Sequence, residues 1–346
     1  MVMRSPVRLV RNTDAGRLFD TFLVSSIATV LLTRLYLSLT GFPQIGGESN
    51  LHIAHMLPGG LLMLTAILIM LGAVNRSSRD VSAFLGGIGF GLFWDELGKF
   101  ITKDNDYFFR PTAGLIYLSF VGLYLLTRYV IRRSYHPQDY LANAIDLAME
   151  GAIGELDPRE YQRAQQLLAK ADRSHPMYQA TVQLLDHAKP TQAYTPFFVD
   201  RAVALIHKPF RRLVQRREFA RALLTLFYIY GLALLCTLGI LLFEGTSHPI
   251  AQLLANPTAR SNSIAATSSI ISSIYIIWGA WLLQHRHTLG ALRRFETALL
   301  INIFITQVFL FFSYQFAATV ALVVALFLLF SVRILLTETK SNNSKV

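Results

Sequence analysis

The sequence predicts an all-α, polytopic integral membrane protein with about eight transmembrane helices and a cytoplasmic helical insert. Three observations indicate this class. Of the 346 residues, 53% are hydrophobic and only 15% are charged, whereas soluble domains carry about 25% charged residues. A helix of roughly 20 mostly apolar residues crosses a bilayer, and several stretches have that length. Arginines gather at the ends of these stretches. The eight stretches are 19–41, 54–73, 82–101, 112–131, 219–242, 264–284, 295–313 and 316–336.

The eight stretches fall into two groups of four. We expect an N-terminal membrane half over 1–131, a cytoplasmic insert over 132–218 and a C-terminal membrane half over 219–346. A shift of 211 residues places "FLGGIGFGLFWDELGKF" over "FETALLINIFITQVFLF". An internal duplication is therefore an open alternative to two unrelated halves.

The first stretch follows a basic N-terminal segment and is too long for the apolar region of a signal peptide, so we expect a retained helix. With the N-terminus inside, most arginines at the ends of the stretches also fall inside, as the positive-inside rule requires. Both termini are then cytoplasmic at the plasma membrane. The net charge of +11 is explained without a nucleic-acid partner. The inner arginines are Arg76, Arg79, Arg132, Arg133, Arg211, Arg212, Arg216, Arg217, Arg286, Arg293 and Arg294.

The insert carries apolar residues at helical spacing in "EYQRAQQLLAKADR" and "MYQATVQLLDHAK". The prolines of "DPRE" and "HPMY" precede these segments, where proline favours a helix start. We expect a small helical lid. The segment "RAVALIHKPFRRLVQRREFARAL" then forms a basic amphipathic lead into 219–242. Its charges predict binding to anionic inner-leaflet lipids near Arg211–Arg217.

The third stretch contains charged residues in "GLFWDELGKFITKDNDYFFRP", residues 91–111. Asp95 and Glu96 lie five to seven residues below the expected outer end, and Lys99 is within helical reach of both. Arg34 lies at nearly the same depth in the first stretch. We therefore expect Arg34 to pair with one of the two acids.

Further polar residues are predicted at the same outer level. The second stretch opens with "HIAHMLPGG", which holds His52 and His55, and the loop "KDNDYFFRP" adds Asp104 and Asp106. Ionisable groups inside a bilayer mark a functional site by default. Two interpretations stay open. The set forms either a structural ion-pair network or a functional polar pocket.

The chemistry of this pocket has two alternatives. His52, His55 and Glu96 offer ligands for a divalent metal such as zinc, iron or manganese. Arg34 and Lys99 would repel a metal and would favour a phosphate or carboxylate.

Small residues predict how the second and third stretches pack. Gly87 and Gly91 form a small-residue step, and Gly59 and Gly60 provide another in the second stretch. Such steps let helices approach closely. Close packing of these two stretches would bring His55 towards Glu96.

The C-terminal half has the character of a scaffold. Its expected membrane centre holds Asn302, Gln307 and many serines and threonines, but no charge. Glu296 stands close to Arg293 and Arg294 at the inner boundary, where we expect an ion pair.

The stretch "FGLFWDELGKFITKDNDYFFRP" resembles a segment of uncharacterised bacterial multi-pass membrane proteins, over about residues 90–111 and the flanking stretches. The resemblance implies a bacterial plasma-membrane protein and brings no activity. Three functions stay open. The first is binding, with transport, of a small ion or polar solute through the outward pocket. The second is a membrane-embedded enzyme at the outer leaflet, and the third is a scaffold that recruits partners through the insert.

Overall fold

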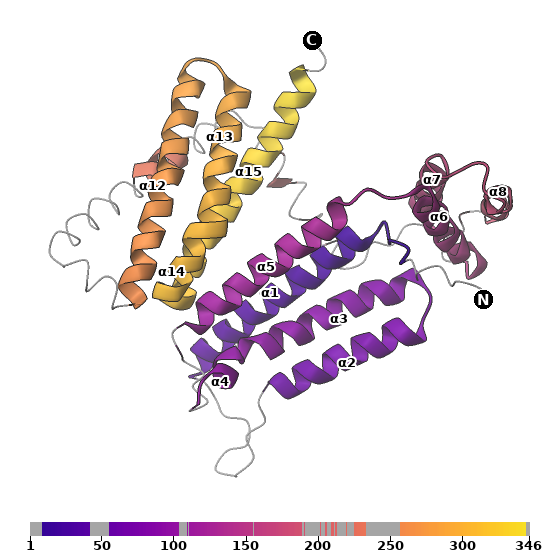
Figure 1. The fold of residues 1–346 in the computed structure, drawn as a ribbon, viewed down its shortest axis with the longest axis horizontal. Coiled ribbons are helices and arrows are strands. Elements are labelled where there is room, and N and C mark those ends of the chain that lie inside the picture. Colours follow the sequence, from indigo (N-terminus) through magenta and orange to yellow (C-terminus); the bar gives the residue numbers. More distant parts are fainter. Residues whose placement is uncertain are drawn as a thin grey trace, which may run out of the picture. The chain divides into compact units, whose positions relative to one another are not determined.

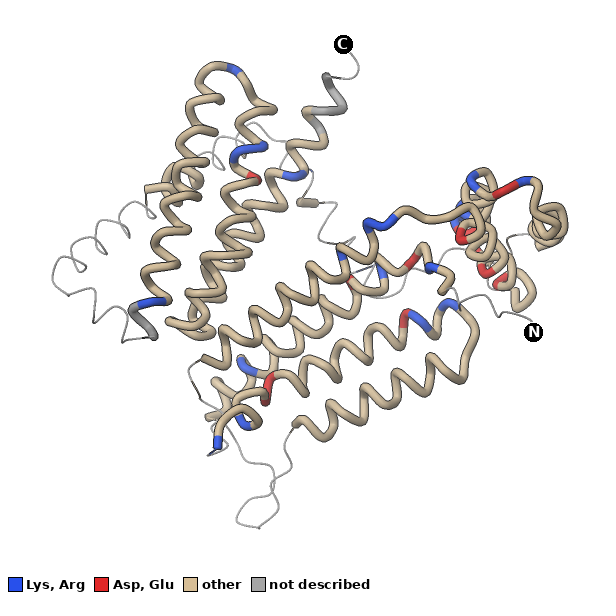
Figure 2. Tube along the Cα trace, in the orientation of Figure 1, with Lys and Arg blue, Asp and Glu red and all other residues tan. Residues whose placement is uncertain are grey.

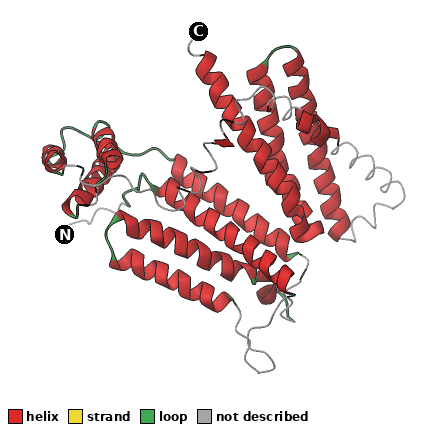
Figure 3. Cartoon of the chain, turned by 180° about the vertical axis from the view of Figure 1, so that it is seen from behind, coloured by secondary structure: helices red, strands yellow, loops and turns green. Residues whose placement is uncertain are grey.

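The computed structural model describes residues 9–41, 55–103, 109, 111–154, 156–188, 225–232 and 257–343, with a few single positions between 190 and 219. This part of the chain is helical and contains no strand (Figure 3). The chain forms two compact units. The first comprises Met1–Glu96 and Gly122–Arg201, and the second comprises Leu97–Val121 and Ala202–Val346. The helical class is confirmed.

Helix α3 (Arg76–Asp95) is the centre of the first unit. It packs against both α1 (Ala15–Thr40) and α2 (Met56–Gly72), as Figure 1 shows. The second part of α5 (Thr112–Arg132) belongs to the same unit, where Arg128 pairs with Asp20 of α1 at 2.7 Å.

Glycines of α3 allow both helix contacts. A Cβ atom at Gly87 would lie 1.9 Å from Ser25 Oγ and 2.5 Å from the carbonyl oxygen of Phe22 on α1. A Cβ atom at Gly89 would lie 2.5 Å from the carbonyl oxygen of Gly59 on α2. The predicted close approach of the second and third stretches is confirmed at Gly59 and Gly89, where only a glycine leaves room for the neighbouring backbone. The predicted small-residue step of Gly87 and Gly91 faces α1 instead.

The insert forms three helices in the first unit: α6 (Pro137–Ala152), α7 (Pro158–Leu168) and α8 (Met177–His187). At the start of α7, Asp157 accepts hydrogen bonds from the N–H groups of Arg159 and Glu160. Prolines at the first position of α6 and α7 remove an N–H that would have no helical partner. The predicted helices of the insert are therefore confirmed. Their apolar faces share one core of Leu141, Leu147, Leu156, Leu167 and Leu185.

Charged side chains join the insert to the ends of α1 and α3. Arg79 donates to both carboxylate oxygens of Asp146 on α6, at 2.6 and 2.7 Å. Carboxyl oxygen Oε1 of Glu150 accepts from the N–H of Arg76 at 2.7 Å. We call these contacts the insert-end network, which consists of Asp14, Arg17, Arg76, Arg79, Asp80, Asp146, Glu150, Glu160 and Arg163.

The second unit contains α4 (Leu97–Ile101) and the first part of α5, followed by a longer helical run. Its core stacks Phe227 on Phe295, with ring centroids 4.4 Å apart, beside Leu299 and Leu328. The elements of the run are α12 (Pro257–Gln284), α13 (Thr288–Ile301), the π-helix η1 (Asn302–Thr306), α14 (Gln307–Tyr314), the 3-10 helix η2 (Gln315–Ala318) and α15 (Thr319–Asn343).

Four stretches are long and apolar enough to cross a membrane: Ala15–Thr40, Thr112–Arg132, Arg260–Gln284 and Thr288–Thr337. The last has 50 residues and reverses at Gln315, which has a left-handed φ of 52°, so that α15 packs back on α13. Helix α2 is apolar but only 17 residues long. The eight spans in two groups of four stay a prediction, and most of 219–242 lies outside the described residues.

The third predicted stretch, 82–101, requires a correction. Helix α3 ends at Asp95, and Glu96 has a φ of −86° and a ψ of 9°, so the chain bends there before α4. Asp95 and Glu96 therefore stand at the end of a helix and not five to seven residues inside it. Arg34 explains the break, because its Nη2 donates at 2.9 Å to the carbonyl oxygen of Asp95, which a helix end leaves without a partner.

Candidate functional site

Four of the predicted site residues meet at the end of the first unit's helices that lies away from the insert. Arg34 projects from the last two turns of α1, and His55 precedes the first turn of α2. Asp95 ends α3, and Glu96 follows it. We call this set the far-end cluster. In Figure 2 the charges of α3 lie near its two ends, with tan residues between them.

Asp95 is the centre of the far-end cluster, and its side chain is 0% exposed. Arg34 Nε donates to Asp95 Oδ1 at 2.5 Å, in addition to the backbone contact described above. His55 Nε2 lies 3.1 Å from Asp95 Oδ2. Both carboxylate oxygens therefore face a nitrogen donor. Hydrogen bonds of this kind stabilise the ionised form of a buried carboxyl group.

His55 lies between the two acids. Its Nδ1 is 3.1 Å from Glu96 Oε1, at ion-pair distance. The contact is a charge contact, because it meets the distance of an ion pair. A carboxylate oxygen can only accept, so the hydrogen of this contact is assigned to His55 Nε2, which donates it to Asp95 Oδ2.

Exposure differs within the far-end cluster. Glu96 is 1% exposed and Asp95 is 0% exposed, whereas the side chain of His55 is 24% exposed. A proton or solute from outside the helices therefore meets His55 before it meets either acid.

Trp94 is a residue of this site that the sequence interpretation missed. Its ring stacks on Phe90 one turn earlier in α3, with centroids 5.2 Å apart. The indole Nε1 is buried and has no hydrogen-bond partner among the described residues. A buried indole N–H usually finds an acceptor. A tryptophan directly before two adjacent acids in an apolar helix was the available signal.

The remaining predicted site residues are not all described. Lys99 lies half-buried on α4, and the bend at Glu96 interrupts the helical spacing on which its predicted reach to Asp95 and Glu96 rested. His52, Asp104 and Asp106 lie outside the described residues.

The metal hypothesis depends on His52, which the structure does not describe. Among the described residues no group of three or more His, Cys, Asp or Glu side chains is arranged to hold a metal ion. Binding of a divalent metal by His52, His55 and Glu96 therefore stays a prediction.

A second buried polar group lies in the second unit, in the half that the sequence predicted to be a scaffold. The π-helix η1 begins at Asn302, whose side-chain oxygen accepts from Gln307 Nε2 at 3.3 Å. Ser268 Oγ and Thr306 Oγ1 are 2.8 Å apart. π-Helices are rare and frequent at functional sites. Their wider turn has no clear signature in sequence spacing.

Comparison with known proteins returned no match, since no family model, no curated protein and no solved structure is similar to this chain. Support for a function therefore comes from two features of the molecule. One is the set of helices that are long and apolar enough to cross a membrane. The other is the buried far-end cluster.

Proposed function

We propose that this chain is a multi-pass protein of the bacterial plasma membrane that binds and transports a small cation or cationic polar solute in exchange for a proton. Both termini are cytoplasmic in this proposal, and the far-end cluster opens outward. One observation carries it. His55 contacts both buried acids, at 3.1 Å each, and Arg34 donates to Asp95.

The charges of the far-end cluster define one exchangeable proton. Arg34 and Asp95 cancel each other. A second carboxylate, Glu96, faces His55 Nδ1, and two unprotonated groups at this distance would repel each other. In this proposal one proton lies between Nδ1 and the carboxyl group of Glu96, and the four side chains together are neutral with the proton on either.

Removal of that proton leaves the far-end cluster with one net negative charge. A monovalent cation that binds in place of the proton restores neutrality. A bare buried charge costs several kcal/mol in a membrane, so the site favours occupation by either the proton or the cation. Alternating occupation of this kind is the basis of exchange. The partly exposed ring of His55 is the point of entry.

A purely structural role does not account for all four residues. The pair Arg34–Asp95 already joins α1 to α3, whereas Glu96 adds a second buried acid at a further desolvation cost. The geometry also disfavours the enzyme hypothesis. In such an enzyme, Arg34 and Lys99 would stabilise a developing negative charge on the substrate, whereas Nε and Nη2 of Arg34 are both directed at Asp95.

Proton exchange is measured in proteoliposomes that contain a pH-sensitive dye and are challenged with gradients of Na⁺ or K⁺ in turn. We expect cation-dependent proton flux from the wild type, and a loss of tenfold or more in Glu96→Gln. The matched control is Glu160→Gln in the insert-end network, which should retain the flux. Full flux in Glu96→Gln, or wild-type flux no greater than that of protein-free liposomes for both cations, would overturn the proposal.

A further inference from the structure

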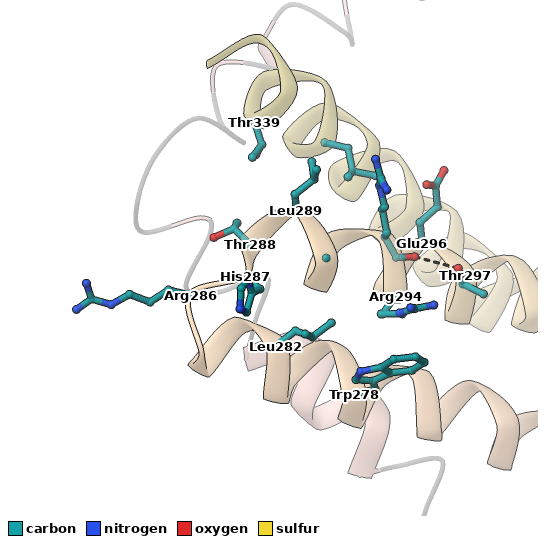
Figure 4. A pocket seen from close by; sticks show the side chains of 13 residues that line it. Trp278, Leu282, Arg286, His287, Thr288, Leu289, Arg294, Glu296, Thr297 and Thr339 are labelled. Carbon is teal, nitrogen blue, oxygen red and sulfur yellow. Dashed lines mark hydrogen bonds between the residues drawn. The ribbon is translucent and has the colours of Figure 1, made fainter. Parts of the chain in front are cut away.

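A cavity of about 1100 Å³ lies in the second unit, where α12 ends, α13 begins and the last turns of α15 pass. Figure 4 shows its lining, with Trp278 and Leu282 on α12, Thr288 and Arg294 at and after the start of α13, and Thr339 on α15. It is unrelated to the far-end cluster, which belongs to the other unit.

The lining of this cavity is strongly basic. Arg286, Arg293 and Arg294 all line it, together with a single acid, Glu296. The sequence predicted that Glu296 would pair with Arg293 or Arg294. That prediction is wrong, because Glu296 accepts from Arg333 Nε at 2.9 Å. Arg333 thus occupies the only carboxylate of the lining, and the three lining arginines form no ion pair within the described residues.

One of these cations is held in place by an aromatic ring. The guanidinium carbon of Arg294 lies 3.7 Å from the centroid of the Trp278 ring, and the two side chains lie against each other in Figure 4. Stacking on a ring fixes the plane of a guanidinium and leaves its N–H groups available to bind an anion. Arg286 extends away from the other labelled side chains in Figure 4.

The backbone N–H groups at the start of α13 lie at the same cavity. The turn at Arg286 has a left-handed φ of 63°, and α13 follows with His287 at its N-cap position but without a side-chain cap. Thr288, Leu289 and Gly290 line the cavity. The first N–H groups of a helix lack helical partners and, with the helix dipole, favour an anion.

From these observations we propose that this cavity binds a phosphate group, held by Arg293 and Arg294 and by the start of α13. Guanidinium groups match phosphate oxygens with paired donors. The volume far exceeds that of a free phosphate ion. Trp278 lines the cavity, and Trp281 follows it by three residues on α12. Both rings are exposed, and exposed tryptophans are typical of the part of a membrane protein that lies at the lipid headgroups. The phosphate of an anionic phospholipid is therefore the expected ligand, with free phosphate as the other source of the same chemistry.

Binding is measured by titrating the purified full chain in detergent with fluorescent phosphatidylglycerol, and with fluorescent phosphatidylcholine for comparison. We expect Arg293→Gln/Arg294→Gln to weaken phosphatidylglycerol binding by tenfold or more. The control is Arg132→Gln/Arg133→Gln, a pair of adjacent arginines that are both exposed and lie at and just after the end of α5. This control should change the affinity by less than about twofold. Equal losses in the two double variants, or no loss in either, would overturn the site.

The source of the phosphate is distinguished by competition with inorganic phosphate. Displacement of the fluorescent lipid by millimolar phosphate supports the site with free phosphate as its ligand, and retention of the lipid supports the phospholipid. Wild-type affinity for phosphatidylcholine equal to that for phosphatidylglycerol would overturn the proposal. Arg293→Gln alone serves as a second variant, because the Arg293 side chain is exposed and its loss leaves the Arg294–Trp278 contact in place.

Discussion

The two ends of α3 hold charges in opposite ways. At the insert end, Arg79 and Asp146 pair while 23% and 32% of their side chains remain exposed. At the far end, Asp95 is 0% exposed and depends on Arg34 and His55. Exposed pairs contribute about 0–1 kcal/mol each, whereas removing one partner of a buried pair costs roughly 3–5 kcal/mol. Burial, and not the number of ion pairs, therefore decides which end of α3 tolerates change.

The largest effect is expected at the far end. Arg34→Met removes both guanidinium hydrogen bonds to Asp95 and the positive charge beside its buried carboxylate, so we expect the free energy of unfolding in detergent to fall by about 3–5 kcal/mol. Arg128→Met is the matched control, because the Arg128–Asp20 pair is 35% and 48% exposed and should lose at most about 1 kcal/mol. Similar losses in the two variants would show that burial does not separate them.

The middle of α3 should respond to volume and not to charge. Gly87→Ala places a Cβ atom 2.5 Å from the carbonyl oxygen of Phe22, and overpacking of this kind costs about 1–3 kcal/mol. Gly60→Ala has nothing within 4 Å of the new atom and should stabilise its helix by up to about 1 kcal/mol. Thermal unfolding of both variants measures the difference, and equal shifts of the same sign would contradict the observed packing.

The smallest effect is expected at the insert end. A double-mutant cycle on Arg79→Ala and Asp146→Ala should give a coupling near 1 kcal/mol at low salt, with hydrogen exchange in α6 as the measurement. Raising the salt from about 0.05 to about 0.5 M should weaken this coupling by screening. The matching cycle on Arg34 and Asp95 should be less sensitive to salt, because Arg34 is only 14% exposed and Asp95 is 0% exposed. Salt dependence at both ends would remove the distinction between them.

The sequence predicted part of the far-end cluster for physical reasons that are visible in it. Arg34 and Asp95 are costly charges that the predicted stretches place at nearly the same depth, and small residues in the second and third stretches indicated the close approach of α2 and α3. The bend at Glu96 was missed because it depends on a contact with Arg34, 62 residues earlier in the chain. Helical spacing alone continues without interruption from Asp95 to Lys99.

The insert was predicted as a helical lid that packs on the membrane domain, but the ion pairs that attach it were not predicted. Its prolines and apolar periodicity are local signals, and the observed helices follow them. Its ion pairs with α3 join residues 67 to 84 positions apart, and spacing along one helix carries no information about such pairs. Arg76 and Arg79 were interpreted only as markers of orientation, whereas they also bind Glu160 and Asp146.

Helix α3 is a single rod of 20 residues, roughly 30 Å long, with the insert at one end and the far-end cluster at the other. Thermodynamic linkage makes such an arrangement reciprocal. Consider a ligand that displaces α3 when it binds beside His55. The change that this ligand causes in the docking free energy of the insert must equal the change that docking of the insert causes in the binding free energy of the ligand. In the proposed topology, a cytoplasmic protein that binds α6 would then change the ligand occupancy of the far-end cluster across the bilayer, without contacting that cluster.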